Sequence, residues 1–274
     1  MKSLVCITGA TGGLGRAFSV ECANRGWDLF LTDLADNSLS ILAASLTNTY
    51  NVNVYYRSCD LTNFEARTEL FDYLREQGFC FNFLINIAGL DFEGPFSERT
   101  RSQIRTMLRL NIEATVEMTH EIMKMRDISR TFRVINVASL AAYYPMPVKA
   151  MYASSKRFLL DFSRALREEL RFFDVSITAL CPAGMPTTPE CIRAIEAQGF
   201  AGRITTQNVG YVAAHTIDSA LKGRSVYIPG LLNKLLKAAG SLVPPTIVAR
   251  VVGSRWKSAQ SKRALLGSVN SNPQ

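Results

Sequence analysis

Hydrophobic positions with two different spacings alternate along the chain. Short β-branched or aromatic runs predict strands, and longer stretches with apolar residues three and four positions apart predict helices. The predicted strands lie near Leu4–Thr8, Asp28–Asp33, Val52–Arg57, Phe83–Asn86, Arg133–Ala138, Ser176–Leu180 and Ser225–Ile228. The predicted helices lie near Gly15–Arg25, Ser38–Thr49, Phe64–Gln77, Arg101–Met125, Met151–Phe172 and Thr206–Leu221. This alternation is typical of an α/β protein.

Seven strands separated by helices predict a parallel, doubly wound sheet of the Rossmann type. Parallel neighbours need right-handed crossover connections, and these connections place helices on both faces of the sheet. Ligands of such sheets bind at the carboxyl ends of the strands. The residues that follow each strand are therefore the candidates for a functional site.

The composition favours one globular domain. The 274 residues are 47% hydrophobic, which allows a substantial core, and no low-complexity stretch or long linker divides them. No run reaches the roughly 18 apolar residues of a membrane span, and the first residues enter the first predicted strand without the layout of a signal peptide. We therefore expect an intracellular, cytoplasmic protein.

The cysteines and histidines do not have the spacing of a metal site. No C-x-x-C pair occurs, and neither His120 nor His215 has ligand spacing with a cysteine. We expect no metal and reduced, mostly buried thiols at Cys6, Cys22, Cys59, Cys80, Cys181 and Cys191.

Positive charge is concentrated near the C-terminus. The net charge is +8, and Asp218 is the last acidic residue. Apolar and basic residues interleave from Gly230 to Trp256, which predicts one or two amphipathic helices broken at Pro244-Pro245. The extension 231–274 is either a solvated basic face or a contact surface for a membrane, an acyl carrier or a coenzyme A phosphate. No nucleic-acid-binding signature accompanies the charge, so nucleic acid is not an expected partner.

A glycine-rich turn follows the first predicted strand. The sequence TGATGGLG places Gly9, Gly13 and Gly15 where the chain turns into a helix. Glycine there lets a pyrophosphate approach the backbone amides, and the positive end of the helix dipole stabilises its charge. The turn therefore predicts a dinucleotide site.

An acidic residue indicates which dinucleotide is bound. Asp33 lies 24 residues after Gly9, at the end of the second predicted strand. A carboxylate there can accept hydrogen bonds from both ribose hydroxyls of an adenosine and repels a 2′-phosphate. Thr11 lies in the turn and Leu34 follows Asp33, so we expect no compensating cation. The pattern favours NAD over NADP, while a helix-capping role for Asp33 is the alternative.

The motifs and their order resemble those of the short-chain dehydrogenase/reductase superfamily. The turn follows T-G-x-x-x-G-x-G, Asp60-Leu61 follows the third strand, and Asn86-Ile87-Ala88-Gly89 stands where the family usually has N-N-A-G. After the sixth strand comes CPAGMPTT, with Ala183 in place of the family's glycine. The resemblance covers residues 3–230.

The resemblance implies a catalytic domain over residues 1–230, with a sheet in the order 3-2-1-4-5-6-7 and a substrate loop at 182–204. It also implies a homodimer or homotetramer formed through the long helices. The residues implied to contact the cofactor are Gly9, Thr11, Gly12, Gly13, Leu14, Gly15, Asp33, Asp60, Leu61, Asn86, Ala88, Gly89, Tyr152, Lys156, Pro182, Gly184 and Thr187.

Three polar residues are placed to act on a carbonyl group. Tyr152 and Lys156 lie four residues apart, on one face of a predicted helix, and Ser139 ends the preceding strand. Tyr152 can donate a proton to a developing alkoxide, and the Lys156 cation favours its ionised form. Ser139 can hydrogen-bond the substrate oxygen, and the resemblance implies that Asn111 holds a water in a proton relay. Each residue has an ordinary structural alternative, but together they favour catalysis.

Apolar residues follow the fourth, fifth and sixth strands, and Lys149 is the main ionisable exception around Ser139 and Tyr152. An apolar lining suits a lipophilic ketone. A hydroxysteroid dehydrogenase is the leading hypothesis, and a 3-oxoacyl reductase or a non-enzymatic NAD-sensing protein remains open. The expected substrate contacts are Phe92, Leu140, Tyr143, Tyr144, Met146 and Met185.

Overall fold

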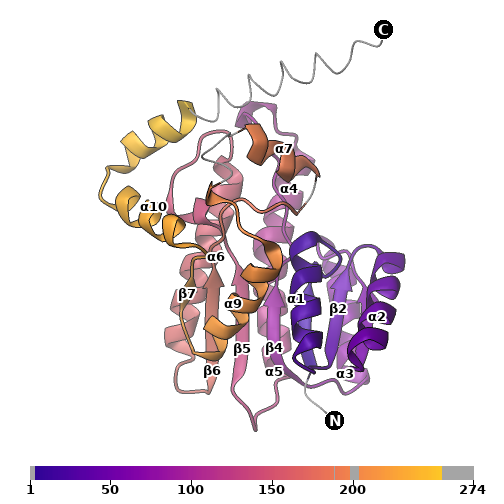
Figure 1. Cartoon of the computed structure of the whole chain (residues 1–274). Coiled ribbons are helices and arrows are strands. Elements are labelled where there is room, and N and C mark those ends of the chain that lie inside the picture. Colours follow the sequence, from indigo (N-terminus) through magenta and orange to yellow (C-terminus); the bar gives the residue numbers. More distant parts are fainter. Residues whose placement is uncertain (1–3, 188, 198–203, 255–274) are drawn as a thin grey trace.

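A computed structural model describes residues 4–187, 189–197 and 204–254. Its seven parallel strands form one sheet in the order β3-β2-β1-β4-β5-β6-β7, which confirms the predicted fold (Figure 1). The predicted loop 182–204 is thus described except for residues 188 and 198–203, and the C-terminal extension is described as far as residue 254. The strands are β1 Leu4–Thr8, β2 Leu29–Asp33, β3 Val54–Ser58, β4 Phe81–Asn86, β5 Phe132–Val137, β6 Val175–Leu180 and β7 Val226–Tyr227.

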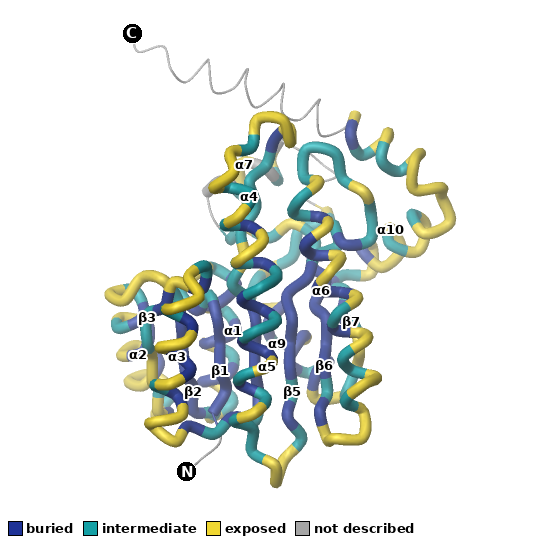
Figure 2. The backbone as a smooth tube through the Cα atoms, turned by 180° about the vertical axis from the view of Figure 1, so that it is seen from behind, coloured by how far each residue is buried: buried dark blue, intermediate teal, exposed yellow. Residues whose placement is uncertain are grey.

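Helices cover both faces of the sheet (Figures 1 and 2). One face carries α1 (Gly13–Asn24), α2 (Asp36–Tyr50) and α9 (Val209–Leu221). The other carries α3 (Phe64–Glu76), α5 (Ala114–Lys124) and α6 (Ala150–Glu169).

Alternating side chains of the buried strands supply both cores. In β1, Val5 and Ile7 pack in the core beneath α1, α2 and α9, whereas Leu4 and Cys6 pack beneath α3 and α5. This alternation follows from the two-residue period of a strand, and burial on both sides explains why the central strands are mostly apolar.

The long helix predicted over Arg101–Met125 is interrupted. The structure has α4 (Arg101–Leu108), a π-helical turn η2 (Arg109–Glu113) and α5 in its place. A π turn accommodates one extra residue within a helix, so apolar periodicity on its two sides does not reveal it. Asn111, one of the predicted catalytic residues, lies within this turn and is buried.

The carboxyl ends of the strands are covered by later parts of the chain (Figure 1). These include α7 (Pro189–Ala197), α10 (Leu231–Ser241) and a helix over residues 245–254. The two C-terminal helices are separated just before Pro245, as predicted, because proline cannot continue the preceding helix. Within the described ranges, no helix is long and apolar enough to cross a membrane.

Candidate active site

The structure brings the four predicted catalytic residues together at the carboxyl edge of the sheet. The hydroxyl of Tyr152 is hydrogen-bonded to Ser139, which follows β5. The Lys156 ammonium lies 5.8 Å from the centre of the Tyr152 ring. A Cβ atom on Gly89 would lie 3.2 Å from both Lys156 Nζ and Asn111 Oδ1, so these two side chains flank the same backbone. β4, β5, α6 and the π turn therefore converge on one point.

Asn111 braces the loop after β4 against α6. Its Oδ1 accepts a hydrogen bond from the Leu90 amide at 2.9 Å. Its Nδ2 donates to the Leu90 carbonyl at 2.9 Å and to Ser155 Oγ at 3.0 Å. Both amide hydrogens are used by the protein, so the side chain does not itself offer a free donor to the water implied by the family resemblance.

Burial controls the protonation of Lys156. The side chain is 4% exposed, and its ammonium donates to the Val137 carbonyl at 2.7 Å. Burial lowers the pKa of Lys156 to about 8, which neighbouring Cys181 and Asp91 only partly offset. A positive charge at this position is therefore conditional on pH.

Burial also raises the pKa of Tyr152. The hydrogen bond with Ser139 and the charge of Lys149 act in the opposite direction, and the nearby Asp91 adds to the rise. The Lys149 ammonium lies 5.6 Å from the centre of the Tyr152 ring. The phenol thus retains its proton at neutral pH, which is the form that a proton donor requires.

A charged cluster beside Tyr152 was missed by the sequence analysis, which emphasised apolar residues there. Lys149 Nζ lies 2.6 Å from Asp91 Oδ2 and 3.3 Å from Glu93 Oε2, and each side chain is about one-fifth exposed. Asp91 Oδ1 is buried and accepts no hydrogen bond from the described residues. The signal in the sequence was two acidic residues directly after the Asn86–Gly89 motif.

The glycine-rich turn packs closely against two other strand-end segments. Gly9 has a φ of +66°, and a Cβ atom on it would approach the Ala88 amide nitrogen to 2.8 Å. A Cβ atom on Gly15 would lie 2.0 Å from the Gly9 carbonyl oxygen. Gly13 faces Thr187 in the same way, at 2.8 Å from its carbonyl oxygen. Side chains are excluded at these glycine positions. The glycine-rich turn therefore meets the segment after β4, at Ala88, and the segment after β6, at Thr187.

Asp33 lies at this turn, and both of its carboxylate oxygens accept hydrogen bonds from the protein. Its Oδ2 accepts hydrogen bonds from the Thr11 amide at 2.8 Å and hydroxyl at 2.7 Å, and its Oδ1 accepts from the Leu34 amide at 2.7 Å. The exposed Arg16 donates from Nε to the Thr11 carbonyl at 2.8 Å. The first turn of α1 therefore folds a cation, which the sequence analysis did not name, back onto the loop beside Thr11.

Other predicted cofactor residues face different surroundings. Asn86 donates to Thr119 Oγ1 at 3.0 Å and to Asn136 Oδ1 at 2.9 Å, within the sheet and its helical layer. Leu14 and Leu61 are buried in the two cores. These side chains hold the framework rather than facing outward. Gly12 and Asp60 are exposed, whereas Pro182 is buried.

The predicted substrate contacts divide into two groups. The hydroxyl of Tyr144 donates to the Leu236 carbonyl at 2.7 Å, and that of Tyr143 lies 3.4 Å from Arg164. Both hydroxyls thus have partners within the protein, since α10 and α6 pack around them. The others are partly buried near the strand ends: Phe92, Leu140, Met146 and Met185.

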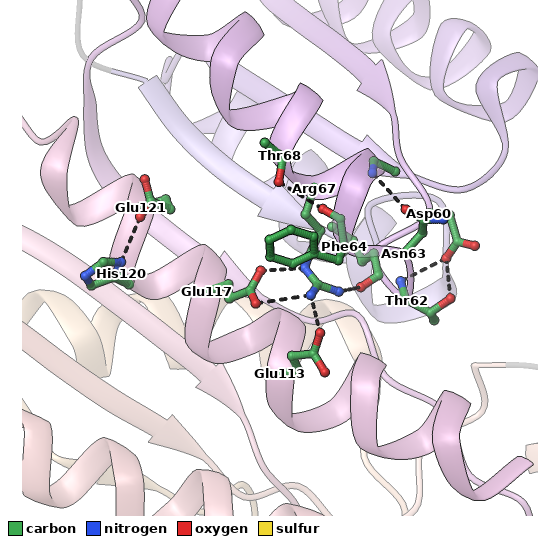
Figure 3. Close-up of polar contacts among 12 residues, drawn as sticks. Asp60, Thr62, Asn63, Phe64, Arg67, Thr68, Glu113, Glu117, His120 and Glu121 are labelled. Carbon is green, nitrogen blue, oxygen red and sulfur yellow. Dashed lines mark hydrogen bonds and ion pairs between the residues drawn. The ribbon is translucent and has the colours of Figure 1, made fainter. Parts of the chain in front are cut away.

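A buried arginine that the sequence analysis overlooked lies between the segment after β3 and the helix that carries Glu113 and Glu117 (Figure 3). Arg67 is 0% exposed and donates to the Leu61 carbonyl at 2.7 Å. Its guanidinium also pairs with Glu117 at 2.7 Å and with Glu113 at the end of the π turn. The segment after β3 is thereby tied to the turn that carries Asn111.

The histidines and cysteines have ordinary structural roles in the part of the chain that is described. His120 is exposed and paired with Glu121, as Figure 3 shows, and the His215 ring stacks on Tyr211. All six cysteines are free thiols, and four of them are buried. No group of three metal-binding side chains occurs among the described residues.

Three known relatives are similar to this chain over about two-thirds of its length. Human 17-beta-hydroxysteroid dehydrogenase type 3 is 29% identical over 68% of the chain and 60% of the relative. Sulfoacetaldehyde reductase 2 of Chromohalobacter salexigens is 32% identical over 69% of the chain and 74% of the relative. Very-long-chain 3-oxoacyl-CoA reductase-A of Danio rerio is 26% identical over 68% of the chain and 59% of the relative. The chain thus spans about three-fifths of the first and third of these proteins.

Solved structures have the same fold. A 7beta-hydroxysteroid dehydrogenase superposes with a TM-score of 0.81 at 21% identity, covering 91% of this chain and 96% of that one. A short-chain dehydrogenase from Sphingobium yanoikuyae in complex with NADPH gives a TM-score of 0.73 at 25% identity, covering 88% and 94%. The family model for short chain dehydrogenases matches residues 3–192, and with the sheet order and the glycine-rich turn it establishes that the chain belongs to the short-chain dehydrogenase family.

Proposed function

We propose that this protein is a nicotinamide-dependent oxidoreductase that interconverts a secondary alcohol and a ketone. The observation that carries the proposal is the partly buried Tyr152, whose phenol is hydrogen-bonded to Ser139 and has the Lys156 ammonium beside its ring. These groups lie at the carboxyl edge of a doubly wound sheet, next to the glycine-rich turn, where such folds bind dinucleotides.

Each side chain has a distinct role in the proposed reaction. A bound nicotinamide supplies the hydride for reduction of the carbonyl carbon. Tyr152 donates its phenolic proton to the carbonyl oxygen, and Ser139 hydrogen-bonds that oxygen and orients it. Lys156 stabilises the tyrosinate left behind and binds the nicotinamide ribose. Asn111 is a positioning residue, since it braces α6 through Ser155.

NAD(H) is the cofactor that we propose. The residues present fit a dinucleotide, because the turn at Gly9, Gly13 and Gly15 leaves bare backbone beside the first turn of α1. The Asp33 carboxylate at the end of β2 favours ribose hydroxyls and repels a 2′-phosphate. Arg16 partly offsets this repulsion, and the Sphingobium relative was solved with NADPH. The preference therefore rests on which charge is nearer to the 2′ position.

A lipophilic ketone, with a hydroxysteroid first, is the proposed substrate. Phe92, Leu140, Met146 and Met185 are partly buried apolar residues near the strand ends, and a buried apolar surface favours a ligand with few polar groups. The human relative's name supports a steroid. The Asp91 oxygen without a partner adds one acceptor for a substrate hydroxyl.

A 3-oxoacyl thioester is the second candidate. The basic residues after Asp218 and the Danio rerio relative favour it. An NAD-sensing protein without activity is disfavoured, because it would not need the Tyr152–Ser139–Lys156 arrangement. A screen of NADH oxidation over steroid ketones, 3-oxoacyl thioesters and small polar ketones separates the three. Turnover of thioesters but not of steroids would reverse the order of the candidates.

Replacement of Tyr152 tests the reaction itself. Tyr152→Phe should lower kcat by roughly two to four orders of magnitude, the usual scale of general acid catalysis. Binding of NADH, followed by its fluorescence, should be nearly unchanged because the phenol acts on the substrate. Tyr73→Phe, a change of the same size on α3, is the matched control and should retain full activity. Substantial turnover by Tyr152→Phe would require another proton donor.

A further inference from the structure

Helix α10 exposes its apolar side to the surface of the protein. The exposed fractions of Leu231, Leu235 and Leu242 are 73%, 58% and 87%. On the opposite side of the helix, Asn233 is 0% exposed and Gly240 is partly buried. A helix that serves only the core would have the reverse arrangement, because burial of leucine drives packing.

Polar and small residues attach this helix to the protein. Asn233 Nδ2 donates to the Pro229 and Thr205 carbonyls at 2.8 and 3.2 Å. A Cβ atom on Gly240 would lie 2.3 Å from the Tyr144 ring, so only glycine permits this approach. Lys237 Nζ lies 5.5 Å from the centre of the Tyr143 ring. These contacts fix which side of α10 faces outward.

The next helix continues the same kind of surface. Ile247 and Val251 are 48% and 52% exposed, whereas Gly253 is buried against Pro147. Figure 2 shows α10 and residues 245–254 as a largely exposed projection beside the carboxyl end of the sheet. The C-terminal apolar face is defined here as Leu231, Leu232, Leu235, Leu236, Leu242, Val243, Ile247 and Val251.

The charged residues on the two helices that carry the C-terminal apolar face are all basic. Nine Lys and Arg and no Asp or Glu follow Asp218 in the sequence. Lys234 and Arg250 lie on the two helices themselves and are exposed. An apolar face with basic residues and no acidic ones matches the interface of an anionic bilayer, where leucines enter the acyl boundary and cations meet lipid phosphates.

We propose that the C-terminal apolar face docks on the surface of an anionic lipid bilayer. Pairing with a second copy is less favourable, because a twofold contact brings the same cations face to face. α10 packs on the segment Leu140–Tyr143, directly after Ser139, so docking places this part of the candidate active site near the lipid surface. The proposal does not depend on the proposed function, since lipid binding requires no turnover.

Vesicle co-sedimentation of the full chain tests the proposal. We expect binding to phosphatidylcholine vesicles that contain phosphatidylglycerol, with weaker binding at high salt. The triple change Leu231→Gln, Leu235→Gln and Leu242→Gln should weaken binding at least about tenfold, through loss of apolar contact. Lys234→Gln with Arg250→Gln should weaken it by about fivefold per charge.

The matched control places the same change on distant exposed apolar residues. Ile41→Gln, Ile128→Gln and Phe172→Gln alter side chains that are 61%, 85% and 82% exposed, and binding should persist. Loss of binding in this control, or no binding by the unmodified protein, would overturn the proposal. Conversion of an oligomer to a monomer by the leucine changes, without loss of lipid binding, would assign the face to a second copy instead. Capture by an immobilised acyl carrier protein but not by vesicles would assign it to that carrier.

Discussion

Lys156 combines a buried position with a charge, and this combination has a consequence for stability. Its pKa is about 8 in the folded protein and 10.5 ordinarily. Between these values the unfolded chain binds more protons than the folded one, so this group makes the free energy of unfolding rise with pH. Below pH 8 the folded protein carries a buried ammonium at a cost.

We predict that the unmodified protein gains stability relative to Lys156→Met as pH rises from 7 to 10. The gain should be roughly 2 kcal/mol, since the methionine variant has no proton to release at this position. Urea unfolding of both proteins at each pH measures it. Thiols such as Cys6, whose pKa is raised by burial, lower stability above pH 9 in both proteins and cancel in the difference. A difference that does not change with pH would contradict the assignment.

Asp33 and Arg16 together determine the predicted choice of cofactor. We predict a higher kcat/KM with NADH than with NADPH in the unmodified protein. Asp33→Ala should lower the ratio of kcat/KM with NADH to kcat/KM with NADPH by about tenfold, the effect of removing one repulsive charge contact. Arg16→Gln is the opposing variant and should raise this ratio, because it removes the cation beside Thr11. Equal kcat/KM values with NADH and NADPH in the unmodified protein would show that Asp33 does not select between the two cofactors.

At the scale of elements, one ion cluster holds α3 against the π turn and α5. Arg67 is completely buried, while its partners Glu113 and Glu117 are 43% and 30% exposed. Burial of a guanidinium without a paired carboxylate costs folding free energy. The ion cluster therefore stabilises the contact of α3 with the π turn and α5 (Figure 3). Glu113 lies only two residues after Asn111. The ion cluster therefore supports the position of Asn111 in the candidate site.

We predict that Glu113→Gln with Glu117→Gln lowers the free energy of unfolding by about 3 to 5 kcal/mol. Either change alone should cost less, because the remaining carboxylate still pairs with Arg67. Glu121→Gln, on the same helix, is the control and should cost about 1 kcal/mol or less, since its partner Arg75 is half exposed. Denaturant titrations of the unmodified protein and these four variants measure the differences, and a double variant as stable as the control would contradict the prediction.

At the scale of the whole molecule, α6 offers a surface for self-association. Phe158 is 42% exposed and stacks on Phe162 with ring centres 5.9 Å apart. Exposed stacked aromatics on a helix are typical of a subunit contact. This surface agrees with the homo-oligomer expected from the family resemblance, which we retain as a proposal.

We predict that Phe158→Glu converts an oligomer into a monomer at micromolar concentration. A buried carboxylate at a subunit contact is costly, because its charge loses water without gaining a partner. Light scattering measures the mass. Phe172→Glu is the control, since this side chain is 82% exposed just beyond α6, and it should leave the mass unchanged. A monomeric mass for the unmodified protein would contradict the proposed homo-oligomer.

The sequence by itself determined the parallel sheet and the sites of its loops. Strand periodicity, helix periodicity and the glycine-rich turn are local properties, because each is encoded within a few neighbouring residues. The same holds for the spacing of Tyr152 and Lys156, which four residues of helix place on one face. These predictions agree with the structure for that reason.

Only the tertiary structure decided which side chains share partners. Arg16 beside Thr11, Arg67 beside Glu113 and Lys149 beside Asp91 each depend on how separate segments fold together. Burial likewise raised the pKa of Tyr152, and the docking of Asn233 set the outward direction of the leucines on α10. Contact and desolvation act through space, so periodicity along the chain carries no record of them.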